Sequence, residues 1–342
     1  MKVARLYSYT DIRIEEYALP DIGPRDVLMK TRACGICSGD VMPWYIEKKA
    51  PLVIGHEPSG EIVATGDDVQ GFQAGDRIFV HHHAPCNACR CCLRGDFVQC
   101  STWKSSSIIP GGVSEYVLIP DVNLRHDTLK LPQSVGFEDG SLVEPCACVV
   151  KSLSRAGIRH GDTLLVLGLG VMGQLHVLLA RTFGAERIIG VDFVRYRRDK
   201  AKEFGADVVL DAGESFLEKK LADITGGRMA DVVIVGPNSA EAMELGINLV
   251  APGGSIVFFT PAKPGEMLTI DPNRLYFRDA KIITSYSCGP DDTRRALGYI
   301  EQGVVSAAKL VTHRFPIEET EKAYRFTAEA RDSLKCLIVF SD

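Results

Sequence analysis

The stretch Thr163-Leu-Leu-Val-Leu-Gly-Leu-Gly-Val-Met-Gly173 decides the fold of this 342-residue chain. Its first part, Thr163–Leu167, is a continuous apolar run that predicts a strand covered on both faces of a sheet. The rest has the pattern GxGxxG and runs into Val171–Phe183, which has helical periodicity. Here the glycines permit a tight turn, close approach of a pyrophosphate and close helix–strand packing. We therefore expect a dinucleotide at the helix N-terminus, bound by Gly168, Gly170, Val171, Met172 and Gly173.

Further strand candidates follow this stretch and alternate with helical segments such as Arg195–Phe204. They are Arg187–Val191, Asp207–Leu210, Asp231–Val235, Ser255–Thr260 and Lys281–Ser285. Such alternation predicts a parallel sheet with right-handed crossovers. We expect an α/β Rossmann domain, a doubly wound parallel sheet, over residues 148–289.

Asp192 lies 19 residues beyond Gly173, at the end of the strand candidate Arg187–Val191. A carboxylate there can accept hydrogen bonds from the adenosine ribose and would repel a 2′-phosphate, which favours NAD over NADP. Arg195, Arg197 and Arg198 follow closely and could offset that repulsion, so NADP stays an alternative.

The residues before about 147 have a different pattern, which consists of short apolar runs separated by Gly, Pro and Asp turns. The runs are Val3–Tyr7, Val27–Ala33, Ile62–Ala64, Arg77–Val80 and Tyr116–Ile119. Short strands of this kind predict a barrel or a compact β-fold. After about 290 the chain returns to mixed helix and strand and ends on the strand-like Cys336–Phe340.

The composition limits the partners that we expect. A net charge of −5 gives no reason to expect nucleic acid or an anionic membrane as a partner. No apolar run approaches the roughly 18 residues of a membrane helix, and the N-terminus has no signal-peptide core. We expect a cytoplasmic protein, in which 11 cysteines argue for metal binding rather than a disulfide framework.

Four of these cysteines, Cys86, Cys89, Cys92 and Cys100, have the spacing C-x2-C-x2-C-x7-C. Four thiolates can close a tetrahedral shell around zinc, which makes such a site structural. Cys91 could replace Cys92 as the third ligand, although the regular spacing favours Cys92. An iron–sulfur centre or free thiols are the alternatives.

A second set of metal-binding residues is scattered over the β-rich part. Cys37 follows a predicted strand, His56 and Glu57 come 19 and 20 residues later, and Glu144 lies near its end. Cysteine, histidine and carboxylate suit a zinc ion that keeps an exchangeable position, where it can lower the pKa of a bound alcohol. Separately, each of these residues could equally be an ordinary buried or capping residue.

The order of these motifs resembles the zinc-containing medium-chain dehydrogenase/reductase family, and within it the sorbitol (polyol) and threonine dehydrogenase branches. The resemblance covers essentially the whole chain: GICxxD, GHE, the four-cysteine loop, an EP pair and GxGxxG. It implies a GroES-like β-barrel catalytic domain, residues 1–147 and 290–342, with the structural zinc loop at 86–100. It also implies an active site in the cleft between that domain and the Rossmann domain.

The resemblance implies roles for several residues. Cys37 and His56 match ligands of a catalytic zinc, and Glu57 or Glu144 would complete the ligand set, giving two zinc ions per chain. Asp40 matches an acid that orients the histidine ligand. His83 lies where threonine dehydrogenases carry a histidine near the active site, and it could accept a proton or simply belong to a histidine run.

Two positions depart from the family pattern. Gly39 stands where the family often has a serine or threonine that passes on the alcohol proton, and Met42 where it often has a histidine. The proton could instead leave through Ser38, Glu57 or a water chain.

We therefore expect an oxidoreductase that moves a hydride between a polyol or secondary alcohol, or its carbonyl, and NAD(H). A threonine-type amino-alcohol or hydroxy-acid dehydrogenase is one alternative, with Arg278 as a weak candidate for binding an anion. A non-catalytic dinucleotide-binding protein is another. The resemblance further implies a homodimer or homotetramer.

Overall fold

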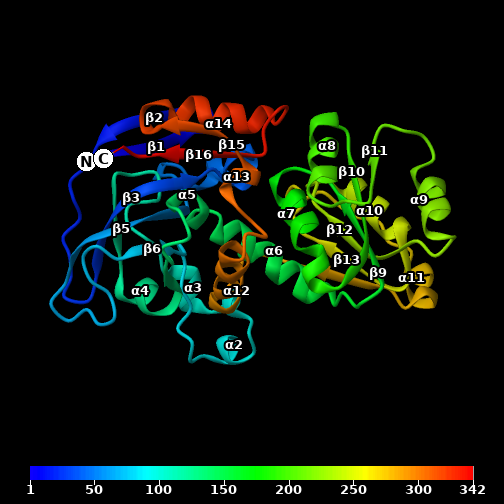
Figure 1. Ribbon diagram of the computed structural model, residues 1–342, viewed down its shortest axis with the longest axis horizontal. Helices are drawn as coiled ribbons and strands as arrows, with labels where there is room; N and C mark the ends of the chain where they lie inside the picture. The colour runs from blue at the N-terminus through cyan, green and yellow to red at the C-terminus, as the bar shows by residue number, and fades with distance from the viewer. Residues whose placement is uncertain (342) are drawn as a thin grey trace. The chain divides into compact units, whose positions relative to one another are not determined.

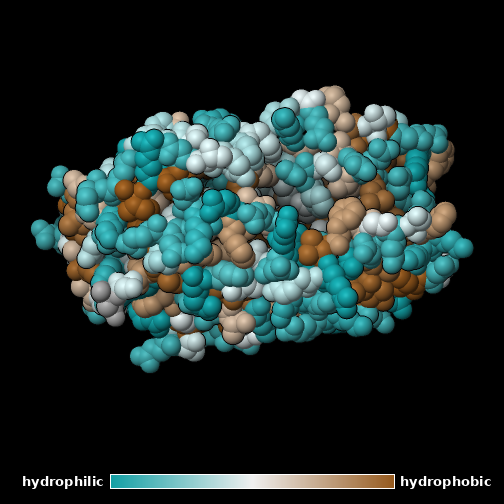
Figure 2. All heavy atoms as spheres, turned by 90° about the horizontal axis from the view of Figure 1, so that it is seen from above, coloured by the Kyte–Doolittle hydropathy of each residue, from teal (hydrophilic) through white to brown (hydrophobic). Residues whose placement is uncertain are grey.

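The computed structural model describes residues 1–341, and these form two compact units (Figure 1). Unit 1 consists of residues 1–147 and 288–341, and unit 2 of Cys148–Ser287. Among the described residues, no helix has both the length and the apolar character needed to cross a membrane. The face drawn in Figure 2 is mainly hydrophilic, with hydrophobic side chains reaching the surface in separate patches.

Unit 2 is built on a six-stranded parallel sheet with the order β11-β10-β9-β12-β13-β14. The strands are β9 (Asp162–Leu167), β10 (Ala185–Asp192), β11 (Val208–Asp211), β12 (Ala230–Val235), β13 (Val250–Phe258) and β14 (Lys281–Thr284). The strand order reverses between β9 and β12, as in a doubly wound sheet, so the predicted Rossmann fold is confirmed. The glycine-rich turn leaves β9 at this reversal.

Helices cover the sheet because alternate residues of each strand point to opposite faces. On one face Leu165 and Val233 pack in a core that includes Leu221 and Met243. The helices of unit 2 are α7 (Val171–Ala180), α8 (Arg195–Glu203), α9 (Leu217–Thr225), α10 (Ala240–Leu249) and α11 (Pro272–Arg278), while α6 (Val143–Ala156) starts in unit 1. The helix predicted over Val171–Phe183 ends as a 3-10 turn at Phe183, because Gly184 takes a left-handed conformation (φ 107°).

Unit 1 contains a seven-stranded sheet and a three-stranded sheet. The larger has the order β15-β16-β3-β5-β6-β8, with β7 also paired to β3, and the smaller has the order β2-β1-β4. The strands are β1 (Lys2–Ser8), β2 (Asp11–Glu16), β3 (Val27–Gly35), β4 (Leu52–Val53), β5 (Glu57–Thr65), β6 (Arg77–Val80), β7 (Tyr116–Ile119), β8 (Thr128–Lys130), β15 (Val311–Pro316) and β16 (Lys335–Val339). The pairings are antiparallel except for β15 with β16, which confirms the expected compact β-fold.

The register of β3 positions the residues of interest. Gly35, at its end, is opposite Glu57 of β5 on one side and Leu337 of β16 on the other. The helices of unit 1 are α1 (Pro43–Ile46), α2 (Arg90–Leu93), α3 (Ser101–Ser105), α4 (Asp121–Asp127), α5 (Phe137–Gly140), α12 (Pro290–Glu301), α13 (Ala307–Leu310) and α14 (Thr320–Glu329). Residues from the first part of the chain and from its last part therefore meet in one unit.

Candidate metal and nucleotide sites

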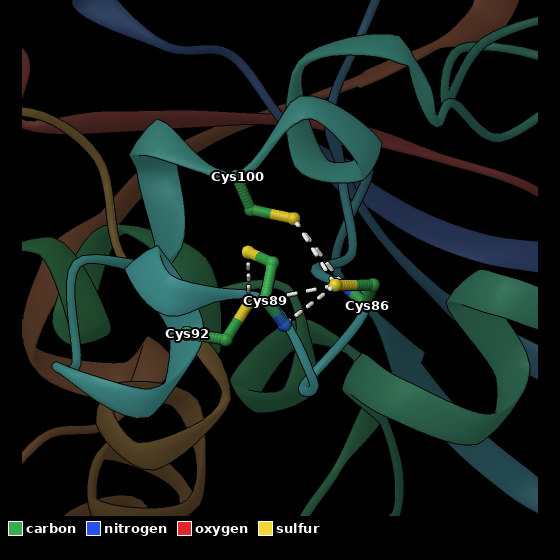
Figure 3. Close-up of side chains that lie close together, drawn as sticks. All are labelled: Cys86, Cys89, Cys92 and Cys100. Carbon is green, nitrogen blue, oxygen red and sulfur yellow. Dashed lines mark hydrogen bonds between the residues drawn. The ribbon is translucent and has the colours of Figure 1, made fainter.

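The sulfur atoms of Cys86, Cys89, Cys92 and Cys100 point toward a common centre (Figure 3). Sulfur–sulfur distances are 3.5 Å from Cys89 to Cys92, 3.6 Å from Cys100 to Cys86 and 3.9 Å from Cys86 to Cys92. Zn–S bonds of about 2.3 Å in a tetrahedron place their sulfurs about 3.8 Å apart, whereas a disulfide requires about 2 Å. The four thiols therefore fit a zinc ion, and Cys92 rather than Cys91 belongs to the group.

Local hydrogen bonds favour the thiolate form of Cys86 and Cys100, whereas burial raises the pKa of Cys92 to about 12. The backbone N–H of Cys89 donates to Cys86 Sγ at 3.3 Å, and that of Cys86 donates to Cys100 Sγ at 3.5 Å. Although burial opposes it, backbone N–H groups of Cys86 and Trp103 lower the pKa of the Cys100 thiol to about 6. Thiolates are the form that binds a metal.

A second group consists of Cys37, His56 and Glu57, whose ligand atoms all lie within 4.8 Å of one another. Cys37 is the N-cap of a 3-10 helix (Ser38–Val41), and its Sγ accepts a hydrogen bond from the backbone N–H of Gly39 at 3.3 Å. Asp40 Oδ2 lies 3.1 Å from His56 Nδ1. This contact leaves Nε2 as the ring nitrogen of His56 available to a metal.

The electrostatic surroundings of this group favour a cation. Although burial opposes it, Asp40 and Cys37 raise the pKa of His56 well above its ordinary value. The same negative neighbours stabilise a divalent ion, because both act on whatever positive charge lies between them. The donor set has the mixture of sulfur, nitrogen and oxygen that zinc accepts.

Glu57 is held from behind by Lys335, a residue that the sequence did not single out. Lys335 is 1% exposed, its Nζ lies 2.5 Å from Glu57 Oε2, and it donates to the carbonyl of Ile36 at 2.9 Å. Glu57 Oε1 is buried and has no hydrogen-bond partner among the described residues, as expected of an atom that awaits a metal or substrate. Only glycine fits opposite, because a Cβ at Gly35 would lie 1.8 Å from Glu57 Oε2.

Three other predicted site residues of unit 1 do not belong to this trio. Glu144 is grouped with His81 and His82 instead. Ser38 is exposed. His83 stacks against Trp103, with ring centroids 4.5 Å apart, and its Nδ1 lies 2.5 Å from the carbonyl oxygen of Ser106. Burial lowers the pKa of His83 to about 4, so the ring is neutral near pH 7.

In unit 2 the glycine-rich turn has the geometry that a pyrophosphate needs. Gly168 is left-handed (φ 85°), and a Cβ at Gly173 would lie 2.0 Å from the carbonyl oxygen of Gly168. By contrast, a Cβ at Gly170 would meet nothing closer than 4.0 Å. The backbone is thus tight where helix and strand pack and open at the N-cap of α7, which fits an incoming phosphate.

Asp192 is tied to this turn. Its Oδ2 accepts from the backbone N–H of Leu169 at 2.7 Å, and its Oδ1 from that of Val194 at 2.7 Å. Arg197 Nη1 lies 3.7 Å from Oδ2, and Arg198 pairs with Asp211 at 2.8 Å. Arg197 and Arg198 therefore each lie close to a carboxylate. Arg197 lies close to Asp192, the acid whose repulsion of a 2′-phosphate it could offset.

Besides Lys335, the sequence did not single out Asp127 and Cys288. Asp127 Oδ2 lies 2.9 Å from His81 Nδ1, and Cys288 Sγ lies 3.6 Å from His81 Nε2. A buried lysine in a hydrophobic terminal strand is a usable signal, because lysine is almost never fully buried without a partner. Asp127 and Cys288 carried no such signal, since their neighbours come from distant segments.

Comparison with known proteins identifies both halves of the chain. Residues 23–133 match the family described as "Alcohol dehydrogenase GroES-like domain", and residues 171–302 match "Zinc-binding dehydrogenase".

Full-length relatives share both halves. A sorbitol dehydrogenase of Bombyx mori is 30% identical over 98% of this chain and 97% of its own. Sorbitol dehydrogenase 2 of Saccharomyces cerevisiae is 31% identical over 96% of this chain and 95% of its own.

Solved structures show the same fold. A zinc-binding dehydrogenase from Sinorhizobium meliloti bound to NADP has a TM-score of 0.89 at 28% identity, covering 99% of each chain. The 2R,3R-butanediol dehydrogenase of Bacillus subtilis has a TM-score of 0.87 at 25% identity, again covering 99% of each chain.

Proposed function

Because the chain belongs to the zinc-containing medium-chain dehydrogenase/reductase family of oxidoreductases, we propose that it transfers a hydride between a polyol or secondary alcohol and NAD(H). The observation that carries this proposal is the group Cys37, His56 and Glu57. Three donors leave a position of a tetrahedral ion for a substrate oxygen, whereas the four-cysteine group leaves none. We assign one zinc ion to each of these two groups.

A zinc ion held by the trio would polarise the substrate oxygen and lower the pKa of an alcohol, and a nicotinamide held by unit 2 would accept the hydride. The chain itself prepares for both. Asp40 fixes the ring of His56, and Lys335 fixes the carboxylate of Glu57. Such positioning is how protein groups around a metal contribute to the rate.

Disposal of the alcohol proton follows from the same geometry. Gly39 and Met42 offer no hydroxyl or imidazole, and Ser38 is solvent-exposed. Glu57 Oε1 is buried without a hydrogen-bond partner among the described residues, but a carboxylate that binds the metal cannot also take up the proton. We assign the removal of the proton to Ser38, next to solvent, and to water.

The substrate class rests on the donor set and on the relatives. Sorbitol dehydrogenases and a butanediol dehydrogenase are among the proteins most similar to this chain, and both names describe alcohols with neighbouring hydroxyl groups. An uncharged polyol also suits a group in which Lys335 is already paired with Glu57.

NAD is the preferred cofactor in this proposal. Asp192 is 6% exposed and accepts hydrogen bonds from two backbone N–H groups, so a 2′-phosphate would meet a carboxylate that is held in place. The NADP-bound relative shows why both cofactors belong in the test.

We also propose that the protein is a homo-oligomer. Strand β14 is an edge of the six-stranded sheet, and its Ile282 is 36% exposed. Tyr276, Phe277 and Tyr286 are at least 55% exposed nearby in the sequence. An open strand edge with apolar side chains is a surface that a second copy can cover.

The test is a spectrophotometric screen of polyols, secondary alcohols, threonine and sugar acids, each with NAD and with NADP. We expect NADH to form with a polyol or secondary alcohol, and the activity to disappear in Cys37→Ala. Turnover of threonine alone would favour the threonine-type alternative. If no compound is turned over at full zinc occupancy, the result would favour the alternative that the protein binds a dinucleotide without catalysing a reaction.

A further inference from the structure

A second set of metal-binding side chains lies in unit 1 next to the catalytic trio. The ligand atoms of His81, His82 and Glu144 all lie within 4.8 Å of one another. Cys288 joins them, because its Sγ is 3.6 Å from His81 Nε2 and within 4.8 Å of a carboxylate oxygen of Glu144. His81, Glu144 and Cys288 are at most 5% exposed, so these polar groups are gathered in the interior.

His81 is held in the orientation of a metal ligand. Its Nδ1 lies 2.9 Å from Asp127 Oδ2, and Thr293 Oγ1 donates to the other oxygen of Asp127 at 2.6 Å. A carboxylate at Nδ1 places the proton there and leaves the lone pair on Nε2, the atom that faces Cys288. A histidine–carboxylate pair of this kind commonly stands behind a protein zinc ligand.

We propose that His81, Glu144 and Cys288 bind a further zinc ion, with His82 as the fourth donor, and we call this group the inner site. Bonds of about 2.3 Å to sulfur and about 2.05 Å to nitrogen, at the tetrahedral angle, separate the two donors by about 3.6 Å. The distance between Cys288 Sγ and His81 Nε2 is 3.6 Å.

The donors of the inner site also balance charge. One thiolate and one carboxylate neutralise a divalent ion and the two imidazoles remain neutral, so the four donors and the ion together carry no net charge, while the Asp127 carboxylate behind His81 accepts a hydrogen bond from Thr293. His82 is suited to that role because its Nδ1 is buried and has no hydrogen-bond partner among the described residues. A buried unsatisfied nitrogen costs free energy that a metal bond would recover.

The inner site adjoins the catalytic trio. The rings of His82 and His56 have centroids 4.8 Å apart, and Glu57 and Glu144 are close enough to influence each other's charge. Neighbouring zinc ions linked through carboxylates occur in other enzymes. The simpler reading is a thiol of Cys288 that donates to His81 with no metal, and it predicts a different metal content.

The test is the zinc content of the purified full-length protein after saturation and removal of excess metal. We expect three zinc ions per chain, and two in Cys288→Ala. The control Cys336→Ala removes another buried thiol of unit 1 that belongs to no metal-binding group, and should keep three. Cys37→Ala should also fall to two while keeping the inner ion, which separates failure of this proposal from failure of the proposed function.

Two zinc ions in both the wild type and Cys288→Ala would overturn the inner site. If Cys288→Ala does not fold, the anomalous signal of zinc in crystals of the wild type decides. A peak within bonding distance of Cys288 Sγ and His81 Nε2 supports the site, and its absence in fully loaded crystals refutes it. With Co²⁺ in place of zinc, the thiolate-to-cobalt charge-transfer absorption should be weaker in Cys288→Ala than in the wild type. It should be unchanged in Cys336→Ala.

Discussion

The four-cysteine group and the proposed catalytic trio are both candidate metal-binding clusters of unit 1, yet they are built in opposite ways. The four cysteines come from one short segment, residues 86–100, and their sulfur atoms complete a shell by themselves. The trio comes from Cys37 and the two neighbours His56 and Glu57, and each histidine or carboxylate is held by a buried charged residue behind it. A local cluster needs only its spacing, whereas an open site needs the fold around it.

The largest effect should come from removing a ligand of the open site. Cys37→Ala should lower kcat/KM by at least about a thousandfold, because the position that activates the alcohol is lost. The unfolding temperature should change little. Steady-state kinetics and calorimetry measure the two quantities, with Cys91→Ala, a cysteine outside both groups, as the control. An active Cys37→Ala protein would refute the assignment of the trio.

Breaking the closed cluster should have the reverse consequence. Cys100→Ser should lose one zinc ion and destabilise the protein by about 4 kcal/mol, because the metal replaces an apolar core in this loop. Urea denaturation and metal analysis provide the measurement. If the variant kept its stability but lost all activity, the four-cysteine group would act in catalysis and not in stability, and the proposed difference between the two clusters would be wrong.

The support behind the trio can be tested through Lys335→Met. Removing the lysine leaves Glu57 buried without its charge partner, which should cost about 3 kcal/mol in protein stripped of zinc. Zinc should recover much of that loss, since the metal supplies the missing positive charge. The exposed Lys219→Met is the control. An equal loss with and without zinc would show that Lys335 acts on packing and not on the charge of Glu57.

His176, a buried histidine that belongs to no metal-binding group, shows how burial alone makes the stability of the protein depend on pH. Burial lowers the pKa of His176 in unit 2 from 6.5 to about 4. Between those values the unfolded chain binds a proton that the folded chain does not, so stability falls as the pH falls from about 6.5 toward 4.

The resulting loss between pH 7 and pH 5 should be about 2 kcal/mol for His176. Urea denaturation of metal-loaded wild type and His176→Leu at both pH values checks this. The variant should lose less stability on acidification than the wild type. Identical pH dependence in the two proteins would contradict the prediction.

The smallest effect concerns the missing hydroxyl at position 39. A Cβ at Gly39 would lie 3.5 Å from its nearest neighbour, Cys37 Sγ, so a serine fits without strain on the cluster. Gly39→Ser should change kcat by less than about tenfold if Ser38 and water already remove the proton. A much larger rise would show that proton removal limits the natural enzyme. Gly39→Ala is the matched control.

Sequence reasoning predicted what depends on local pattern. The turn at Gly168–Gly173, the alternating strands and the spacing of the four cysteines all follow from neighbours in the chain, and the fold that they predict is the one observed. Strand ends differ by a few residues, because pairing in the sheet extends β5 back to Glu57.

Long-range contacts could not be predicted in the same way. The sequence suggested Glu57 or Glu144 as an additional ligand, and the register of β3 and β5 places Glu57 opposite Gly35, two residues before Cys37. His83 attracted attention by position, yet it is His81 that Asp127 orients, through a contact between residues far apart in the sequence. The cytoplasmic location and the oligomeric state stay predictions.

The position of Lys335 also has a consequence for how the protein is made. Unit 1 is interrupted by the whole of unit 2, and Lys335 belongs to the closing segment of unit 1. On the ribosome, Glu57 emerges long before the lysine that neutralises it, while unit 2 can already fold as a domain of its own. Until β16 has been made, β3 lacks one of its neighbours and Glu57 lacks its charge partner, so unit 1 can be completed only after the whole of unit 2 has been synthesised.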